Sequence, residues 1–344
     1  MYAAGAILAH YEPMALFELT RTLVDINSVT GSEQACAEFL RGHLAERGYE
    51  VELQPVSDGR ANVFARHGAP EIVLSTHMDT VPPFVPSRED TEFIYGRGSC
   101  DAKGILAAQV EAAERLRAGG IKNFALLFLV GEETLSDGAR AANRAPRGSH
   151  FIINGEPTEN RLAVGTKGIL RVDIRARGRT AHSAYPHLGE SAIEKLLDIL
   201  NDLRRLPLPR DATLGDATVN IGVISGGTAA NVIPGEARAE VLFRTVDDGR
   251  ALREAVEGAL RDRCEYEFVR QTPAMRMEKL NGFESSVVAF TTDLPNLTAW
   301  GRPLLVGPGS IAVAHTDHEC IRKSDLVAAV ELYVRLVREL EHRP

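Results

Sequence analysis

Imidazole and carboxylate side chains stand at the ends of several apolar segments of this 344-residue chain. The run "EIVLSTHMD" ends with His77 and Asp79, and side chains at positions i and i+2 of a strand point to the same face. A metal-binding histidine usually gives its second ring N–H to a carboxylate, which fixes its orientation. The two residues therefore fit a metal ligand and its orienting group, although a surface pair at a strand end explains this motif equally well.

Two adjacent glutamates, Glu132 and Glu133, follow a second apolar run, "FALLFLVG". Adjacent carboxylates at the end of a buried strand are costly unless a cation compensates them. Because neighbouring side chains point apart, the two should have different tasks: one binds a metal ion, and the other reaches the water on that ion. A solvated acidic loop is the alternative, but the abrupt change from apolar strand to Glu-Glu favours the functional interpretation.

Three further residues have similar settings. Asp101 lies between the glycine-rich turn "YGRGSCD" and a predicted helix, where a helix N-cap is an alternative role. Glu156 follows the apolar strand "FIIN", and His315 lies in a loop before the last helix. The glycine spacing fits neither the dinucleotide fingerprint nor the P-loop. No histidine can be assigned as a base for Cys100, which favours a buried structural thiol over a nucleophile.

Together these residues form a mixed set of imidazole and carboxylate ligands: His77, Asp101, Glu133, Glu156 and His315. Nitrogen and oxygen ligands with few thiolates suit zinc, with cobalt or manganese as substitutes. The five ligands exceed what one catalytic zinc needs. Two metal ions that share one bridging carboxylate would account for all of them.

The elements that must position this set alternate along the first part of the chain. Solidly apolar strands that alternate with helices indicate a mostly parallel sheet buried on both faces, in an α/β architecture. Thr30 and Glu33 are spaced as a capping box for a helix that reaches about Arg47. The other predicted helices are 13–28 and 103–118, and the predicted strands are 51–54, 62–66, 71–77, 124–130 and 150–154.

The pattern changes around Gly165. Strands 169–178 and 237–246 alternate apolar and polar residues, and helical stretches 189–205 and 248–262 lie between and after them. We therefore expect an inserted α+β domain over 167–276, between the two parts of a catalytic domain over 1–166 and 277–344. In the last part we expect a helix near 283–292, a strand at 303–307 and a helix over 324–341.

Composition excludes several classes of protein. A net charge of −8 and a pI near 5.8 argue against broad binding to nucleic acid or to an anionic membrane. The four cysteines include no C-x-x-C pair, which is typical of free thiols in a reducing cytosol. The first 13 residues lack the basic start of a signal peptide, and no run reaches the length of a membrane span. We therefore expect a cytoplasmic protein.

Five motifs, in this order, resemble those of the di-zinc amidohydrolase family: "STHMDTVP", "GRGSCDAKG", "GEE", "GEPT" and "GPGSIAVAHTDHE". That family includes acetylornithine deacetylase, succinyl-diaminopimelate desuccinylase, aminoacylase and glutamate carboxypeptidase. The resemblance covers nearly the whole chain and is greatest to acetylornithine deacetylase. It implies a zinc-peptidase-like catalytic domain with an inserted ferredoxin-like domain, which acts as a lid and forms a homodimer.

The resemblance also implies a role for each candidate. One zinc would be held by His77 and Glu156 and the other by Glu133 and His315. Asp101 would bridge the two ions, with a cis peptide bond to Ala102. The remaining implied roles are the orientation of His77 by Asp79 and general-base catalysis by Glu132, which would take a proton from the water that the two zinc ions share and leave the attacking hydroxide.

Two segments of the inserted domain carry further matches. The family's lid histidine, which reaches the partner subunit's active site and polarises the scissile carbonyl, corresponds to His182 in "GRTAHSAYPH". In "GGTAANVIPGEARAEVLFRT", Asn231 and Arg244 match positions that contact substrate. An arginine fork suits a substrate carboxylate by geometry. Gly309, in "GPGSIAVAH", is the last implied substrate-binding residue.

The implied reaction is hydrolysis of the amide bond of a small N-acyl amino acid, as in acetylornithine deacetylase. Succinyl-diaminopimelate desuccinylase, dipeptidase or carboxypeptidase activity are alternatives within the family. A catalytically silent homologue that only binds a metal or ligand is a different class. It is disfavoured because all five ligands and Glu132 are present.

Overall fold

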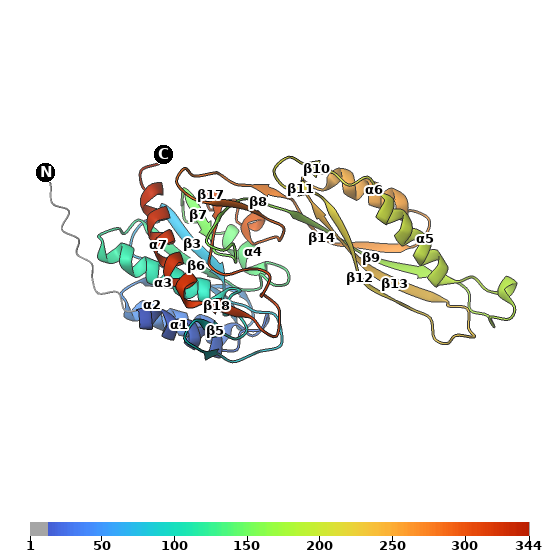
Figure 1. Ribbon diagram of the computed structural model, residues 1–344, viewed down its shortest axis with the longest axis horizontal. Helices are drawn as coiled ribbons and strands as arrows, with labels where there is room; N and C mark the ends of the chain where they lie inside the picture. Colours follow the sequence, from blue (N-terminus) through green and yellow to red (C-terminus); the bar gives the residue numbers. More distant parts are fainter. Residues whose placement is uncertain (1–12, 344) are drawn as a thin grey trace. The chain divides into compact units, whose positions relative to one another are not determined.

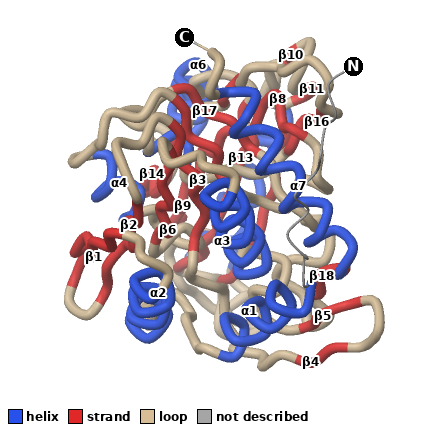
Figure 2. Tube along the Cα trace, turned by 90° about the vertical axis from the view of Figure 1, so that its left-hand side faces the viewer, coloured by secondary structure: helices blue, strands red, loops and turns tan. Residues whose placement is uncertain are grey.

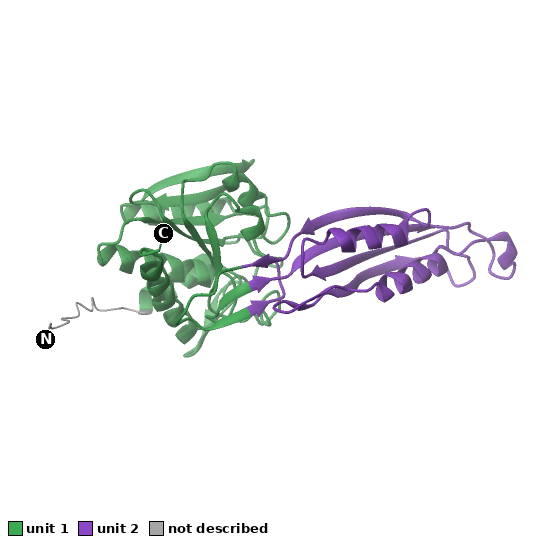
Figure 3. Cartoon of the chain, turned by 90° about the horizontal axis from the view of Figure 1, so that it is seen from above, with its two compact units in different colours: residues 1–164, 277–286, 292–344 green, residues 165–276, 287–291 purple. Residues whose placement is uncertain are grey.

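The computed structural model describes residues 13–343 and divides the chain into two compact units (Figure 3). Unit 1 runs to Val164 and also includes Met277–Ser286 and the chain from Thr292 onward. Unit 2 comprises Gly165–Arg276 and Val287–Thr291. The prediction that the N-terminus is not a signal peptide falls mostly on residues 1–12, which lie outside the described residues.

A six-stranded sheet forms the centre of unit 1 (Figure 1). Four adjacent strands run parallel, and two antiparallel strands extend one edge. The predicted α/β architecture with a mostly parallel sheet is therefore confirmed. In spatial order the strands are β1 (Glu50–Ser57), β2 (Arg60–Arg66), β6 (Phe124–Leu129), β3 (Ile72–His77), β7 (Phe151–Asn154) and β17 (Arg302–Leu305).

Both faces of this sheet are buried, because alternate residues of its apolar strands point to opposite sides. Phe124, Leu126 and Phe128 of β6 join the main core on one face. On the other face, Phe64 of β2 packs against Trp300. Figure 2 shows the helices of the first face in front of the strands. They are α1 (Pro13–Asp25), α2 (Gln34–Glu46), α3 (Lys103–Ala118) and α7 (Lys323–Leu340).

Smaller elements complete unit 1. The short helix α4 (Asp137–Asn143) and the 3-10 helix η2 (Leu294–Asn296) contact each other. The short strands β4 (Arg88–Glu89), β5 (Phe93–Tyr95) and β18 (Cys320–Arg322) form a second sheet. A third sheet has the order β15 (Met275–Arg276), β8 (Leu162–Thr166) and β16 (Ser285–Val288), and its strands lie where the chain passes from one unit to the other.

Two local predictions are wrong. The segment expected as a helix near 283–292 contains strand β16, because its β-branched residues, Val287 and Val288 among them, favour an extended backbone. The capping box is also absent, since Glu33 makes no side-chain cap at α2. The Thr30 hydroxyl instead donates to Asp79, and Glu33 accepts from the Arg60 guanidinium, so charge-assisted partners replace the cap.

Unit 2 has the ferredoxin-like order βαββαβ. Its elements are β9 (Gly168–Arg177), α5 (Ala192–Arg205), β12 (Thr218–Gly226), β13 (Glu236–Thr245), α6 (Arg250–Leu260) and β14 (Glu265–Thr272), joined as an antiparallel sheet in the order β12-β13-β9-β14. The short elements η1 (Pro186–Leu188), β10 (Arg210–Asp211) and β11 (Gly215–Asp216) lie in its loops.

The alternation predicted for this unit arises because one face of its sheet packs on the core formed with α5 and α6, and the other face carries charged side chains. Val172 and Ile174 of β9 pack with α5 and α6, whereas Arg171 and Arg177 of the same strand form ion pairs with glutamates of β13 and β14. The predicted ferredoxin-like insert is confirmed. Within residues 13–343, no helix has both the length and the apolarity that a bilayer span requires.

Candidate metal centre

The predicted ligands gather where parallel strands of the central sheet end. His77 is the last residue of β3, Glu133 follows β6, and Glu156 follows β7. These three strands are neighbours in the order β6-β3-β7 and run in the same direction. Ligand sites of open α/β sheets lie at the carboxyl ends of such strands. The fold therefore brings together side chains that are distant in sequence.

Two groups of three side chains within the described residues have ligand atoms that all lie within 4.8 Å of one another. The first consists of His77, Asp101 and Glu156, and Nε2 of His77 lies 3.0 Å from Oδ1 of Asp101. The second consists of Asp101, Glu133 and His315, and Nε2 of His315 lies 3.5 Å from Oδ2 of Asp101. Asp101 belongs to both groups and faces each histidine with a different oxygen.

The donor set and its surroundings fit a pair of divalent cations. Burial raises the pKa of Glu156 well above its ordinary value, and Oε1 of this carboxylate has no hydrogen-bond partner among the described residues. Burial would also raise the pKa of Asp101, but hydrogen bonds from His315 and His77 outweigh it and lower that pKa. A buried carboxylate without a partner is costly, and a coordinated cation would remove that cost. The mixed set of histidine and carboxylate ligands suits zinc.

Asp79 connects the first histidine to the glutamate pair. Nδ1 of His77 lies 2.9 Å from the backbone oxygen of Asp79 and 3.5 Å from its carboxylate. The carboxylate of Asp79 accepts hydrogen bonds from the backbone N–H groups of Glu132 and Glu133, at 3.1 and 3.2 Å, and from the Thr30 hydroxyl at 2.8 Å. Asp79 is thus placed to fix both the imidazole and the loop with the glutamates.

Glu132, the predicted general base, sits among several acids. Burial raises the pKa of Glu132 well above its ordinary value, and the charge of Asp293 adds to this effect. Asp293 is 1% exposed and was not among the sequence candidates, since its segment was expected to follow a helix. A carboxylate beside the metal ligands is placed to take up and release a proton as a general base.

An arginine holds the far end of the glutamate loop. The guanidinium of Arg60 donates to both oxygens of Glu33, at 2.9 and 2.8 Å, and to Asp137, at 2.5 and 3.2 Å. Gly131, directly before the two glutamates, has φ +75° and lies so close to Asp137 and Arg60 that a Cβ would collide with both. The Glu132–Glu133 loop is therefore fixed at one end by Asp79 and at the other by Arg60.

Three of the predicted residues belong to unit 2. His182 is exposed, and its Nδ1 accepts a hydrogen bond from the backbone N–H of Ala184 at 3.1 Å. Asn231 is exposed on the adjoining segment, where its backbone oxygen accepts from Ser183. Arg244 is half-buried, and burial lowers its pKa.

Gly309 has a packing requirement of its own. It is buried with φ +80°, and a Cβ at this position would lie 2.5 Å from Sγ of Cys100. Its backbone oxygen accepts a hydrogen bond from Glu159 N–H at 2.8 Å. These contacts account for a glycine at this position without substrate.

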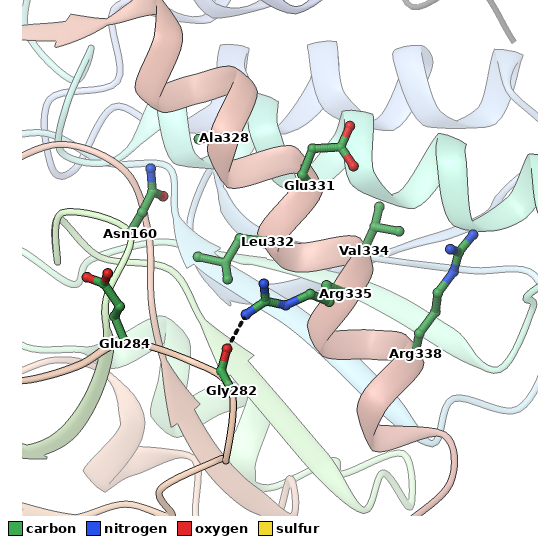
Figure 4. Close-up of a pocket in the computed structure, with 9 residues that line it drawn as sticks. All are labelled: Asn160, Gly282, Glu284, Ala328, Glu331, Leu332, Val334, Arg335 and Arg338. Atoms are coloured by element: carbon green, nitrogen blue, oxygen red, sulfur yellow. Dashed lines mark hydrogen bonds between the residues drawn. The ribbon is translucent and has the colours of Figure 1, made fainter. Parts of the chain in front are cut away.

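A groove of about 630 Å³ lies elsewhere on unit 1, along the outer face of α7 (Figure 4). Acidic and basic side chains both line it, and Arg335 donates to the Gly282 backbone oxygen across it. None of the candidate metal ligands lines this groove. The functional site is therefore identified by the metal-ligand side chains at the strand ends and not by the size of a groove.

Comparison with known proteins shows which family the chain belongs to. A sequence model of the peptidase dimerisation domain matches residues 164–270. A peptidase M20 domain-containing protein of Schizosaccharomyces pombe is 39% identical, over 94% of this chain and 84% of its own. The chain belongs to the peptidase M20 family. A probable carboxypeptidase of Aspergillus clavatus is 40% identical to this M20 chain, over 94% of it and 82% of its own length.

The fold of this M20 chain also occurs in solved structures. An M20 family metallo-carboxypeptidase from Sulfolobus solfataricus has a TM-score of 0.79 at 17% identity, over 94% of this chain and 98% of that one. Membership of the M20 family makes the chain a metal-dependent hydrolase. The family resemblance and the enzyme class predicted from the sequence are therefore confirmed.

Proposed function

We propose that this M20 chain is a di-zinc peptidase of the carboxypeptidase or dipeptidase type. Its substrate would be a small molecule with a peptide or amide bond close to a free carboxylate. The observation that carries the proposal is the pair of ligand groups that share Asp101 at the strand ends. The identity to a probable carboxypeptidase favours peptide substrates over the deacetylation of N-acetylornithine. An N-acyl amino acid presents the same amide-carboxylate unit.

The metal ligands would be divided between two ions. His77 and Glu156 would hold one zinc ion, Glu133 and His315 the other, and Asp101 would bridge them. When bound, the two ions would lower the pKa of a water molecule and polarise the scissile carbonyl. The shared carboxylate suits this arrangement, because its two oxygens already face the two histidines.

Glu132 would be the general base. It would take a proton from the attacking water and return that proton to the departing amine. The amides of the Glu132–Glu133 loop are held by Asp79, which supports a fixed position for this carboxylate. Hydrogen bonds to a buried carboxylate such as that of Asp79 keep a catalytic residue close to its productive geometry.

Three residues of unit 2 would complete the site in a homodimer. His182 would stabilise the oxyanion of the partner subunit's reaction, and Arg244 would bind the substrate carboxylate, with Asn231 as a further contact. A guanidinium binds a carboxylate through two parallel hydrogen bonds. The match to a peptidase dimerisation domain supports the dimer, and we propose the cytoplasm as its compartment.

A substrate panel tests the proposal. The zinc-loaded protein would be assayed with dipeptides, N-blocked dipeptides and N-acetylornithine, each with a free carboxylate and as the C-terminal amide. We expect hydrolysis of peptides with a free carboxylate and at least a hundredfold lower kcat/KM for the amides. Equal rates for both forms would contradict the carboxylate requirement. Cleavage of N-acetylornithine alone would assign a deacetylase.

A further inference from the structure

A buried glutamate outside the ligand set connects the loops of two ligands. Glu319 is 3% exposed, and its Oε1 accepts hydrogen bonds from three backbone N–H groups. These belong to Gly98, Cys100 and Asp101, at 2.9, 3.1 and 3.0 Å. The carboxylate thus binds the backbone of the turn that carries Asp101, the residue common to both metal groups.

Arg97 completes this connection. Its guanidinium donates to Oε2 of Glu319 at 2.7 Å and to the backbone oxygen of Thr316, next to His315, at 3.2 Å. Both side chains of the ion pair are 2% exposed. The backbone oxygen of Glu319 also accepts from Gly96 N–H at 3.1 Å. The turn before Asp101 and the turn after His315 are therefore held together by a buried ion pair that hydrogen-bonds to both turns.

The two histidine ligands differ in what holds them. The backbone of His77 belongs to β3, and its ring contacts the Asp79 backbone oxygen. His315 has φ +63° and a side chain that is 48% exposed, and it lies on a turn rather than a strand. Strand hydrogen bonds fix the first ligand, whereas the second depends on contacts of its loop.

We propose that Glu319, together with Arg97, is a positioning residue that sets the metal affinity of the group formed by Asp101, Glu133 and His315. This inference rests on the proposed function, because it assumes metal ions at these ligands. Loss of the Glu319 charge would loosen the Asp101 turn relative to His315. The group that contains His77 and Glu156 would keep two ligands that do not depend on Glu319. The effect on metal affinity is therefore unequal between the two ions.

Zinc titration of the metal-free protein tests this inference. Glu319→Gln keeps the size of the side chain but removes its charge. We expect the variant to bind one zinc ion less than threefold more weakly than the wild type and the other 10- to 100-fold more weakly, the range seen when groups that support ligands are changed. Asp317→Asn removes the same charge from an exposed residue of the same turn, and both of its zinc affinities should match the wild type.

A second variant, used as the starting protein, identifies which zinc ion is affected. His315→Ala leaves the His77 group as the complete one, so adding Glu319→Gln there should change zinc affinity less than threefold. Equal weakening of both ions, or no weakening, would overturn the inference. If Glu319→Gln does not fold, Arg97→Lys serves in its place, because it keeps the charge but loses the fork, and the same unequal loss is expected. A wild-type chain that binds fewer than two zinc ions would instead refute the proposed function.

Discussion

Nε2 of His315 lies 3.0 Å from Oε1 of Glu133, although the two residues are 182 positions apart in the chain. Glu133 follows a strand of the central sheet, whereas His315 comes from a loop close to the C-terminus. Both also approach Asp101, so three distant segments meet at one point. In the absence of a metal ion, the hydrogen bonds with Asp101 and Glu133 raise the pKa of His315 to about 10.

The first prediction concerns the general base. Glu132→Gln removes the proton acceptor but keeps the shape of the side chain, so turnover should fall by about 10² to 10⁴-fold. Zinc content should stay at the wild-type value, because Glu132 belongs to neither ligand group. Steady-state kinetics and elemental analysis measure the two quantities. Glu284→Gln, at an exposed position, is the control. Substantial activity in Glu132→Gln would remove it from this role.

A second prediction concerns Gly309. Alanine at a positive φ costs about 1 to 2 kcal/mol on its own, and at Gly309 it would also collide with Cys100. Gly120 has a similar φ of +87°, and no atom lies within 4 Å of the place that a Cβ would take there. Gly309→Ala should therefore lower the unfolding free energy by about 1 to 3 kcal/mol more than Gly120→Ala. Urea denaturation measures both, and equal losses would show that close packing at Gly309 has no energetic weight.

Much of the fold was predictable because its signals are local. The apolar strands and the period-2 alternation of unit 2 are visible within windows of about ten residues. The prediction of a helix near 283–292 was wrong because the hydrophobic residues of this segment suit either a helix or a strand. Its β-branched residues favour the strand that the structure contains. The spacing of Thr30 and Glu33 suggested a cap, but distant charged partners took both side chains.

The candidate site was predictable only in part. Four of the five metal-ligand candidates follow predicted strands or glycine-rich turns and therefore leave a pattern in the sequence. The residues that position the ligand loops leave no such pattern in the sequence, because their hydrogen-bond partners are far away in the chain. Arg60 contacts Asp137 across 77 positions, and Glu319 contacts Asp101 across 218. Only the three-dimensional structure pairs them.

A third prediction concerns Arg60. Glu33 is fully buried and depends on this guanidinium, so Arg60→Gln would leave a buried charge without its partner. We expect the unfolding free energy to fall by about 3 to 5 kcal/mol. The control Arg147→Gln breaks an exposed pair with Glu52 and should cost less than about 1 kcal/mol. Adding Glu33→Gln to Arg60→Gln should recover part of the loss, and a further loss would contradict the account.

The fourth prediction concerns pH. Burial, with a contribution from Arg47, lowers the pKa of His43 on α2 to about 4. The unfolded chain, with an ordinary histidine pKa near 6.5, therefore takes up the proton first as pH falls. The stability that neutral His43 contributes is complete above about pH 6.5 and is lost as pH falls toward 4.

This loss is expected to be about 1 to 2 kcal/mol, below the full value of the shift because the ring is partly solvated. Urea denaturation at pH 7 and pH 4.5 would measure it, with His43→Gln as the comparison. The variant should lose less stability than the wild type between these two pH values. An NMR titration that gives His43 an ordinary pKa would remove the physical basis of this prediction.

The most direct test of the central claim is the position of bound metal. Crystals grown with zinc and measured at the zinc absorption edge would give an anomalous difference map. We predict two peaks: one bound by His77, Asp101 and Glu156, and the other by Asp101, Glu133 and His315. Zinc bound elsewhere, or no zinc at these side chains at saturating concentration, would contradict the di-metal centre and the hydrolase mechanism built on it.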